Sequence, residues 1–484
     1  MNTPFTKTAL VLAFVLPVVA GCPSGPPKEP AANSAQPGPQ RTLHVLVIDD
    51  DNLAEGIERQ WRARSDTAIE LHRSSAAGVR AAGGESLGAD VVVFPSGLLG
   101  EFAEQDRIVP LGKRVLESEN FNQQDVFELL RRGETTWGKK SFAVSLGSPQ
   151  LTLMYRQDLF QALDLTPPTT WNAYQQLVDR LAKRDELGDH TPPADGPWHA
   201  AREPLGDGWT GQLLLARAAA YVRHPHQYST LFDLRDMRPL IDGAPFVKAL
   251  EELVKAAPSE AEARATTPAQ VRSDFFSGRC AMAFTWPSHA DTADGGQPAG
   301  EPMQVRFAQL PGSPDVFNFR SQVWEPRAAG EVTTVPLLAS AGRLAALTRR
   351  GRRSSAANTM LLWLGGFELG NIVCPSSTAT TLFRSSQIAG ARRWVNPQLG
   401  DRSAAEYGEL LRRTQNQSIW LSSIRIPARP EYLAALDQAV QRALDGEPAE
   451  KALDAAATKW QQITDELGRD KQQAAYTRSI GLEP

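Results

Sequence analysis

The chain has 484 residues, of which 42% are hydrophobic and 22% charged, and its formal net charge is −4 at neutral pH. A charge this small, spread without long runs of one sign, argues against nucleic acid or an anionic membrane surface as the main partner. After the first 40 residues about 440 remain, too many for one compact core and enough for two lobes.

The first residues have the pattern of a bacterial signal peptide. Lys7 precedes an apolar run from Ala9 to Val19, too short to span a bilayer, since a spanning helix needs about 20 apolar residues. The run ends in Val-Ala-Gly-Cys22, which resembles the lipobox of bacterial lipoproteins. An ordinary secretory signal with a chance cysteine is the alternative. We predict a lipoprotein signal peptide over residues 1–22, with Cys22 as the lipidation site.

Residues 23–41 are rich in Pro, Ala, Ser, Gly and Gln and have no apolar periodicity. Such a segment cannot bury a core, so we predict an extended tether. No later segment is long and apolar enough to cross a membrane.

Next come short apolar runs that alternate with amphipathic segments. Leu43–Ile48 and Ala89–Phe94 are typical of buried strands, and Gly56–Arg64 between them is typical of a helix. This alternation predicts an α/β fold with largely parallel, helix-covered sheets. Pro95–Gly97 follows the second strand as a loop, and ligands of open α/β sheets bind at such strand ends.

The rest of the chain is mainly helical. Helices are predicted from Trp171 to Lys183, with Thr170 as the N-cap, and over Gln212–Val222 and Pro245–Ala256. The Pro-, Gly- and Asp-rich stretch Arg184–Asp207 is predicted as a loop, and Glu431–Leu467 has apolar residues at helical spacing.

Several segments, in order, resemble the maltose-binding-like extracellular solute-binding proteins of ABC importers. They are Ala89–Leu111, Trp137–Val144, Met154–Phe160 with Leu165–Trp171, Phe275–Met282 and Ala452–Leu467. Arg156, Asp164 and Ser145 depart from the family pattern, where Asn, Gly and Pro are usual.

The resemblance implies a two-lobe periplasmic binding protein fold joined by a hinge, in which a solute held between the lobes favours the closed form. Residues 42–150 and 335–380 are expected to form lobe one, and residues 151–334 and 381–484 lobe two. The expected ligand is a small polar solute, most of all a neutral carbohydrate, because no fixed cluster of charges is visible in the sequence. The expected partners are the permease subunits of an ABC importer. The protein is expected to be a monomer, lipid-anchored to the cell membrane or the outer membrane on the periplasmic side.

Sugar sites combine flat aromatic rings with fixed polar groups. Trp209, Trp286 and Trp324 lie in predicted loops or at strand ends, whereas Trp171, Trp363 and Trp460 fall on apolar helix faces typical of a core. By the resemblance, Trp209, Trp286 and Tyr432 lie near the family's aromatic contacts. The polar candidates for ligand binding are Asp50, Ser96, Ser148 and Ser340, for each of which ordinary loop capping is the alternative.

The sequence has no motif that predicts an enzyme or a cofactor. It has neither a Gly-x-Ser-x-Gly elbow, nor His-Glu-x-x-His, nor a phosphate-binding Gly-rich loop. Asp49–Asp51 lacks the Gly and the distant Glu of a calcium loop, so no metal site is predicted. A secreted glycoside hydrolase and a binding lipoprotein that serves a sensor or an assembly remain the alternatives.

Cys280 and Cys374 are the cysteines besides Cys22. Cys280 lies in a predicted buried strand, and the resemblance puts Cys374 in the other lobe. Because a disulfide between the lobes would prevent hinge motion, we predict that the two are not joined.

Overall fold

The computed structural model describes residues 41–84, 86–190, 197–259, 264–291, 303–328 and 331–482, all within one compact unit that spans 41–484. Cys22, the predicted signal peptide and nearly all of the predicted tether lie outside the described residues. Within the described part, no helix is both long and apolar enough to span a membrane.

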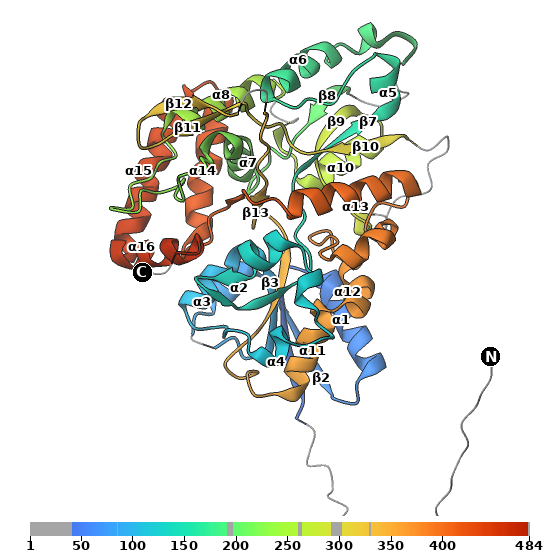
Figure 1. Ribbon diagram of the computed structural model, residues 1–484, viewed down its shortest axis with the longest axis vertical. Coiled ribbons are helices and arrows are strands. Elements are labelled where there is room, and N and C mark those ends of the chain that lie inside the picture. Colours follow the sequence, from blue (N-terminus) through green and yellow to red (C-terminus); the bar gives the residue numbers. More distant parts are fainter. Residues whose placement is uncertain are drawn as a thin grey trace, which may run out of the picture. The chain divides into compact units, whose positions relative to one another are not determined.

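The first lobe is built on a five-stranded sheet of order β2-β1-β3-β14-β6 (Figure 1). The strands are β1 (Leu43–Ile48), β2 (Ile69–Ser74), β3 (Val91–Pro95), β6 (Ala143–Ser145) and β14 (Arg343–Leu347). β1 is parallel to β2 and β3, whereas β14 runs antiparallel to β3 and β6. β14 runs the other way because it re-enters this sheet from the second lobe.

Helices of the first lobe lie around this sheet. They are α1 (Asp51–Arg64), α2 (Ala76–Ala81), α3 (Leu99–Glu104), α4 (Lys113–Leu116), α11 (Ser355–Gly365) and α12 (Phe367–Val373). Of these, α1 and α11 contact the strands of the sheet. α1 begins five residues before the predicted Gly56, because the Asp50 side chain accepts a hydrogen bond from the Leu53 amide and so caps the helix. A short hairpin, β4 (Thr136–Trp137) and β5 (Lys140–Ser141), precedes β6.

The second lobe has a four-stranded sheet of order β10-β7-β9-β8. Its strands are β7 (Thr152–Arg156), β8 (His199–Arg202), β9 (Cys280–Thr285) and β10 (Val305–Ala308), and the helices against it are α5 (Gln157–Ala162), α6 (Trp171–Leu181), α10 (Pro268–Phe276) and α13 (Asp401–Gln415). Only β8 and β9 pair in parallel.

Two sequence expectations are therefore corrected. The sheets are mixed rather than largely parallel, because strands reach them from the opposite lobe as well as through helical crossovers. The predicted loop Arg184–Asp207 contains the strand β8, which is short but gains ladder hydrogen bonds to the buried β9. The two-lobe α/β architecture itself is as predicted.

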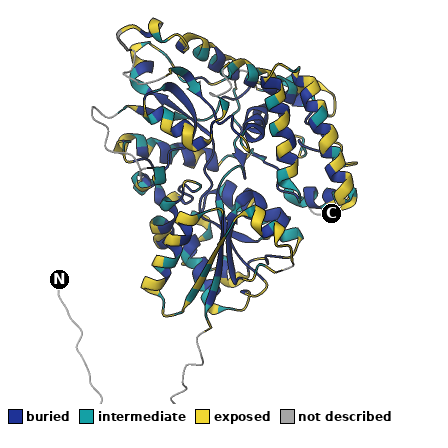
Figure 2. Cartoon of the chain, turned by 180° about the vertical axis from the view of Figure 1, so that it is seen from behind, coloured by how far each residue is buried: buried dark blue, intermediate teal, exposed yellow. Residues whose placement is uncertain are grey.

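Beside the second sheet, four helices pack against one another: α7 (Thr210–Val222), α8 (Ala244–Ala256), α14 (Arg429–Leu444) and α15 (Ala449–Leu467). The helical tail that the sequence predicts from Glu431 to Leu467 is two helices, since Gly446 has a φ of +100° and Pro448 follows it. α16 (Arg469–Ser479) ends the helical series, and the hairpin β11 (Asp315–Asn318) and β12 (Val323–Pro326) lies on α7. Figure 2 shows buried residues concentrated on the strands and on the inner faces of the helices.

The chain passes between the lobes more than once. Residues 146–151 join β6 to β7, and β13 (Leu337–Leu338), which pairs with β15 (Leu421–Ser422), precedes the return to β14. At Gly147 the backbone has a φ of +104°, and a Cβ there would lie 2.0 Å from the carbonyl oxygen of Thr381. Only glycine allows two of the connecting segments to approach this closely.

Candidate functional site

A cavity of ≈ 250 Å³ lies where segments of both lobes meet. Pro95 at the end of β3, Ser96 and Gly97 after it, and the residues Ser340 and Ala341 before β14 form the first-lobe side. The second-lobe side is the end of β9 with the starts of α7, α10 and α14. A pocket between two lobes at the ends of strands is the usual position of a ligand site in such folds.

Two tryptophans that the sequence predicts as ligand contacts, Trp209 and Trp286, form part of the cavity wall. The ring centroids of Trp209 and Trp286 lie 5.7 Å apart, with a 44° angle between the ring planes. Trp286 is 4% exposed, and its Nε1 donates to the Thr378 carbonyl oxygen at 2.9 Å. Trp209, at the N-cap of α7, is only half-buried. Trp209 therefore offers the more accessible ring surface.

Three arginines line the same cavity: Arg272, Arg343 and Arg429. Arg272 forms an ion pair with Asp291, with Nη2 3.0 Å from Oδ1, and its Cζ lies 5.2 Å from the Trp286 ring centroid. Arg343 donates from Nε to Asp50 Oδ2 at 3.0 Å. The sequence suggested no charge cluster, but folding brings one together here.

The third arginine is held differently. Arg429 Nη2 donates to the Ala339 carbonyl oxygen at 3.1 Å, and its buried Nε has no hydrogen-bond partner among the described residues. Burial, with the nearby Arg80 as a second cause, lowers the pKa of Arg429 to about 10. The guanidinium is therefore still charged at neutral pH.

Of the predicted polar residues, Ser96 and Ser340 line the cavity. The Ser96 hydroxyl donates to the Ala341 carbonyl oxygen at 2.8 Å. Asp50 does not line the cavity, since it caps α1 and holds Arg343. Asp50 thus acts on the cavity through Arg343.

Ser148 lies behind the wall and is 1% exposed. Its hydroxyl is 2.7 Å from Glu134 Oε1 and 2.8 Å from the Ala341 carbonyl oxygen. Glu134 is fully buried, and this desolvation raises its pKa, while the hydroxyls of Ser148 and Ser96 oppose the shift. Ser148 belongs to a buried polar network under the cavity and does not line the cavity.

Two predicted aromatic contacts are not at the cavity and need correction. The Tyr432 ring is completely buried, 5.4 Å from the Trp460 ring centroid, and its hydroxyl lies 2.9 Å from Thr464 Oγ1. It is a core residue because α14 turns it onto α15. Trp324 lies on β12 and packs edge-on against Tyr221 of α7, on the hairpin and away from the cavity.

The sequence reasoning missed the arginines and the residues Thr267–Ala269 and Thr378–Ala379 of the wall. One signal was present at Arg429, which occupies the first turn of a helix, where acidic residues are favoured by the helix dipole. Another was Arg272, which shares a helix face with the buried Val271 and Phe275. Neither signal indicates which other residues the arginine meets in the folded protein.

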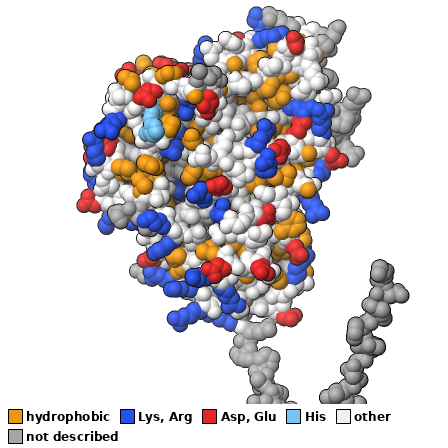
Figure 3. Space-filling view, viewed as in Figure 1, with side chains coloured by type: hydrophobic (Ala, Val, Ile, Leu, Met, Phe, Trp, Pro, Cys, Tyr) orange, Lys and Arg blue, Asp and Glu red, His pale blue; other side chains and the backbone are white. Residues whose placement is uncertain are grey.

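A second cavity, of ≈ 280 Å³, lies among β4, β15 and α16 and is lined by residues such as Arg132, Trp420 and Tyr476. It contains none of the predicted site residues and no end of a strand from either large sheet. On the face shown in Figure 3, basic and acidic side chains are interspersed. The smaller cavity is the better candidate, because predicted site residues and the ends of strands line it.

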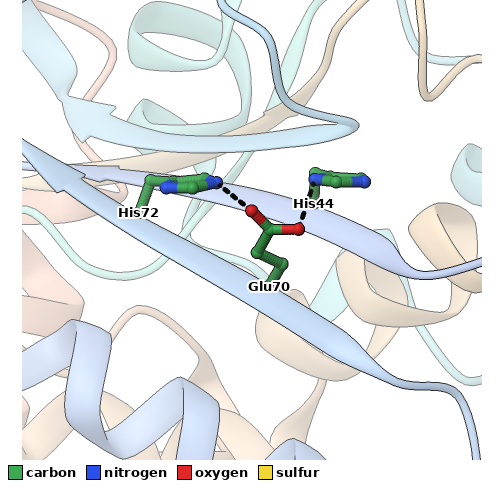
Figure 4. A group of neighbouring side chains, drawn as sticks. All are labelled: His44, Glu70 and His72. Atoms are coloured by element: carbon green, nitrogen blue, oxygen red, sulfur yellow. Dashed lines mark ion pairs between the residues drawn. The ribbon is translucent and has the colours of Figure 1, made fainter.

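One group of side chains outside the cavity could offer metal ligands. His44 of β1 lies 3.3 Å from Glu70 of β2, which is also 3.0 Å from His72 (Figure 4). The Glu70 and His72 side chains are more than half exposed. The ion pairs already account for this arrangement at the edge of the sheet.

Cys280 and Cys374 are buried and free, and burial raises the pKa of both thiols.

Two lobes that enclose a cavity with aromatic rings and fixed polar groups define the class of bilobal binding proteins. The chain belongs to the family of bacterial extracellular solute-binding proteins, whose sequence pattern matches residues 50–312. This confirms the resemblance drawn from segments such as Met154–Phe160. No curated protein sequence matches the chain.

Solved structures show the same fold. The sugar-binding protein MalE from Xanthomonas citri superposes with a TM-score of 0.64 at 16% identity, over 88% of this chain and 98% of that one. An ABC transporter solute-binding protein from Agrobacterium radiobacter K84, in complex with ribitol, superposes with a TM-score of 0.62 at 16% identity, over 87% of this chain and 98% of that one. A maltose-bound MalE3 from T. maritima superposes with a TM-score of 0.58 at 16% identity, over 87% of this chain and 99% of that one. At this identity the likeness establishes the fold.

Proposed function

We propose that this protein captures a carbohydrate in the cavity between its lobes and delivers it to the permease subunits of an ABC importer. The observation that carries the proposal is the Trp209–Trp286 pair, which stands in one cavity with hydroxyl and guanidinium groups from both lobes. Aromatic rings cover the C–H face of a sugar, and fixed polar groups bond its hydroxyls. Ribitol and maltose in structures of the same fold support this ligand class.

The cavity also suggests how binding is coupled to motion. Trp286 at the end of β9 bonds to Thr378, and Arg429 at the start of α14 bonds to Ala339, so second-lobe residues contact connecting segments of the chain. A solute that contacts both walls favours the closed form by the difference in its affinity for the two forms. We propose residues 42–150 and 335–380 as lobe one and the remainder of 42–484 as lobe two.

The proposed role is binding without catalysis. The walls of the cavity offer arginines, hydroxyls and indoles, and among the described residues no carboxylate pair lines it. A glycoside hydrolase needs two such groups at the scissile bond. A lipoprotein that passes the same solute to a sensor remains the second candidate, favoured if no permease subunit binds the loaded protein.

The proposed location is the periplasmic side of a bacterial membrane, with a lipid on Cys22 as the anchor. The lipobox-like Val-Ala-Gly-Cys22 and the Pro-rich residues after it support this. A lipid with two or more chains holds a protein stably on a membrane, and the tether would leave the lobes free to reach a permease.

Calorimetry with a panel of mono- and oligosaccharides tests the ligand class. We expect at least one saccharide to bind with 1:1 stoichiometry and to raise the melting temperature, because a ligand of the folded state stabilises it. Amino acids and simple metal salts serve as controls. A panel in which only these controls bind contradicts the carbohydrate proposal.

A further inference from the structure

The charge of the cavity wall is one-sided. Arg272, Arg343 and Arg429 line it, and among the described residues no Asp or Glu does. A neutral sugar does not need such an excess. The three cations differ in whether a carboxylate of the protein neutralises them.

Two of the arginines are neutralised by carboxylates. Asp291 pairs with Arg272 and Asp50 with Arg343, each with one N–O contact at 3.0 Å. These pairs fix the two guanidinium groups, leaving little net charge for a ligand. A hydrogen-bonded buried pair of this kind is mainly a structural feature.

Arg429 has no ion pair among the described residues. Its one hydrogen bond within the described part of the chain is to the Ala339 carbonyl oxygen. The carboxylates of Glu101 and Asp437 attract the Arg429 guanidinium, but among the described residues neither accepts a hydrogen bond from it, and Glu101 Oε2 binds Arg80 Nη2 at 2.6 Å. Asp437 accepts hydrogen bonds from Thr210 Oγ1 at 2.8 Å and from the Gly211 amide at 2.7 Å, at the start of α7.

Helix ends add positive potential on the same wall. Arg429 is the first residue of the 16-residue helix α14, whose N-cap, Ala428, supplies no side-chain hydrogen bond. Pro268 and Ala269, at the start of α10, also line the cavity. The amino ends of helices carry partial positive charge and favour an anion nearby.

Arg429 is also held firmly in place. A Cβ at Gly97 would lie 2.4 Å from its Nε and 2.6 Å from its Cζ, so the guanidinium rests directly on the backbone of the loop after β3. A cation that is fixed, charged and unpaired beside a ligand cavity is preorganised for an anionic partner.

We infer that the solute is an anionic carbohydrate, a sugar that bears a carboxylate or a phosphate, and that Arg429 binds its acid group while the tryptophans cover its ring. This inference rests on the proposed carbohydrate function and narrows its ligand class. Carboxylate and phosphate both accept paired hydrogen bonds from a guanidinium, so the experiment has an arm for each.

The test is calorimetry with matched sets: glucose, glucuronate and glucose 6-phosphate, then galactose and galacturonate. We expect at least one acid to bind roughly tenfold or more tighter than its neutral counterpart, and added NaCl to weaken the acid only. Arg429→Gln should weaken the acid by roughly ten- to a hundredfold and the neutral sugar by much less, because only the acid loses a charged partner. Arg429→Lys should retain part of the preference.

Arg412→Gln, on the exposed face of α13, is the control and should leave the affinity for acidic and neutral sugars unchanged. Gly97→Ala displaces the Arg429 guanidinium without removing it, and should also reduce the preference for the acid; melting curves show that each variant is folded. If neutral sugars bind as tightly as the acids, or if salt weakens both equally, the inference is overturned while the carbohydrate function stands. If no saccharide of either kind binds, the proposed function itself falls.

Discussion

The indole rings of Trp209 and Trp286 lie 5.7 Å apart and are inclined at 44°, so the two rings meet at an angle and do not stack in parallel. The pair joins a half-buried residue at the start of α7 to a buried residue at the end of β9. Removing one ring or the other should therefore have different effects on the affinity for the ligand and on the stability of the protein.

Trp209→Ala should weaken sugar binding with little effect on folding. A stacked ring contributes about 1–3 kcal/mol, which corresponds to a roughly five- to hundredfold loss of affinity. Trp286→Ala should also destabilise the ligand-free protein by about 3–5 kcal/mol, because it removes a buried ring and its bond to Thr378. Calorimetry and thermal melting of both variants check this. Unchanged affinity in Trp209→Ala would show that the ring does not contact the sugar.

Glu134 should make stability depend on pH. Its pKa is raised in the folded state by desolvation, so folding favours the protonated carboxyl. The stabilisation is fully present below the unfolded-state pKa and is lost as the pH rises through the folded-state pKa. Glu134→Gln should remove this contribution. The melting temperature of the wild type should therefore fall relative to that of the variant from pH 4 to pH 8. A difference that stays constant over this range would contradict the prediction.

Cys280 and Cys374 should be unreactive until the protein unfolds. Both thiols are buried, and their raised pKa values keep them protonated, whereas the thiolate is the reactive form. In Cys22→Ser protein, a thiol reagent should label slowly under native conditions and label both thiols in denaturant. Linked peptides in a non-reduced digest would instead show a disulfide.

Cys22→Ser should release the protein from the membrane. In the proposed anchor the lipid is attached through the thiol, and a serine hydroxyl does not replace it, while the lobes beyond residue 41 form their own compact unit. Cell fractionation followed by blotting compares the variant with wild type. A variant that stays in the membrane pellet would show that another feature holds the protein there.

The fold could be predicted because its signals are local. Leu43–Ile48 and Ala89–Phe94 form strands as expected, and Thr170 caps α6 at the predicted residue. The prediction failed where pairing is non-local. β8 is a strand because the buried β9 lies beside it, and the sheets are mixed because β14 returns from 190 residues or more away.

For the site, the sequence could indicate residue types and strand ends but not which of them meet. It pointed to Ser96 because this residue follows a strand, and to Trp209, Trp286 and Ser340 largely through the family resemblance, and all four line one cavity. It also pointed to Tyr432, which has the same helix-start position but faces the core.

The sequence by itself determined the family, the two-lobe class and the signal-peptide pattern, since these depend on residues close together in the chain. Only the tertiary structure decided the charge of the cavity. Asp50 neutralises Arg343 from nearly 300 residues away, and Gly97 supports Arg429 from the opposite lobe. Whether an arginine is paired or free depends on distances in space, and the spacing of residues along a chain does not encode these distances.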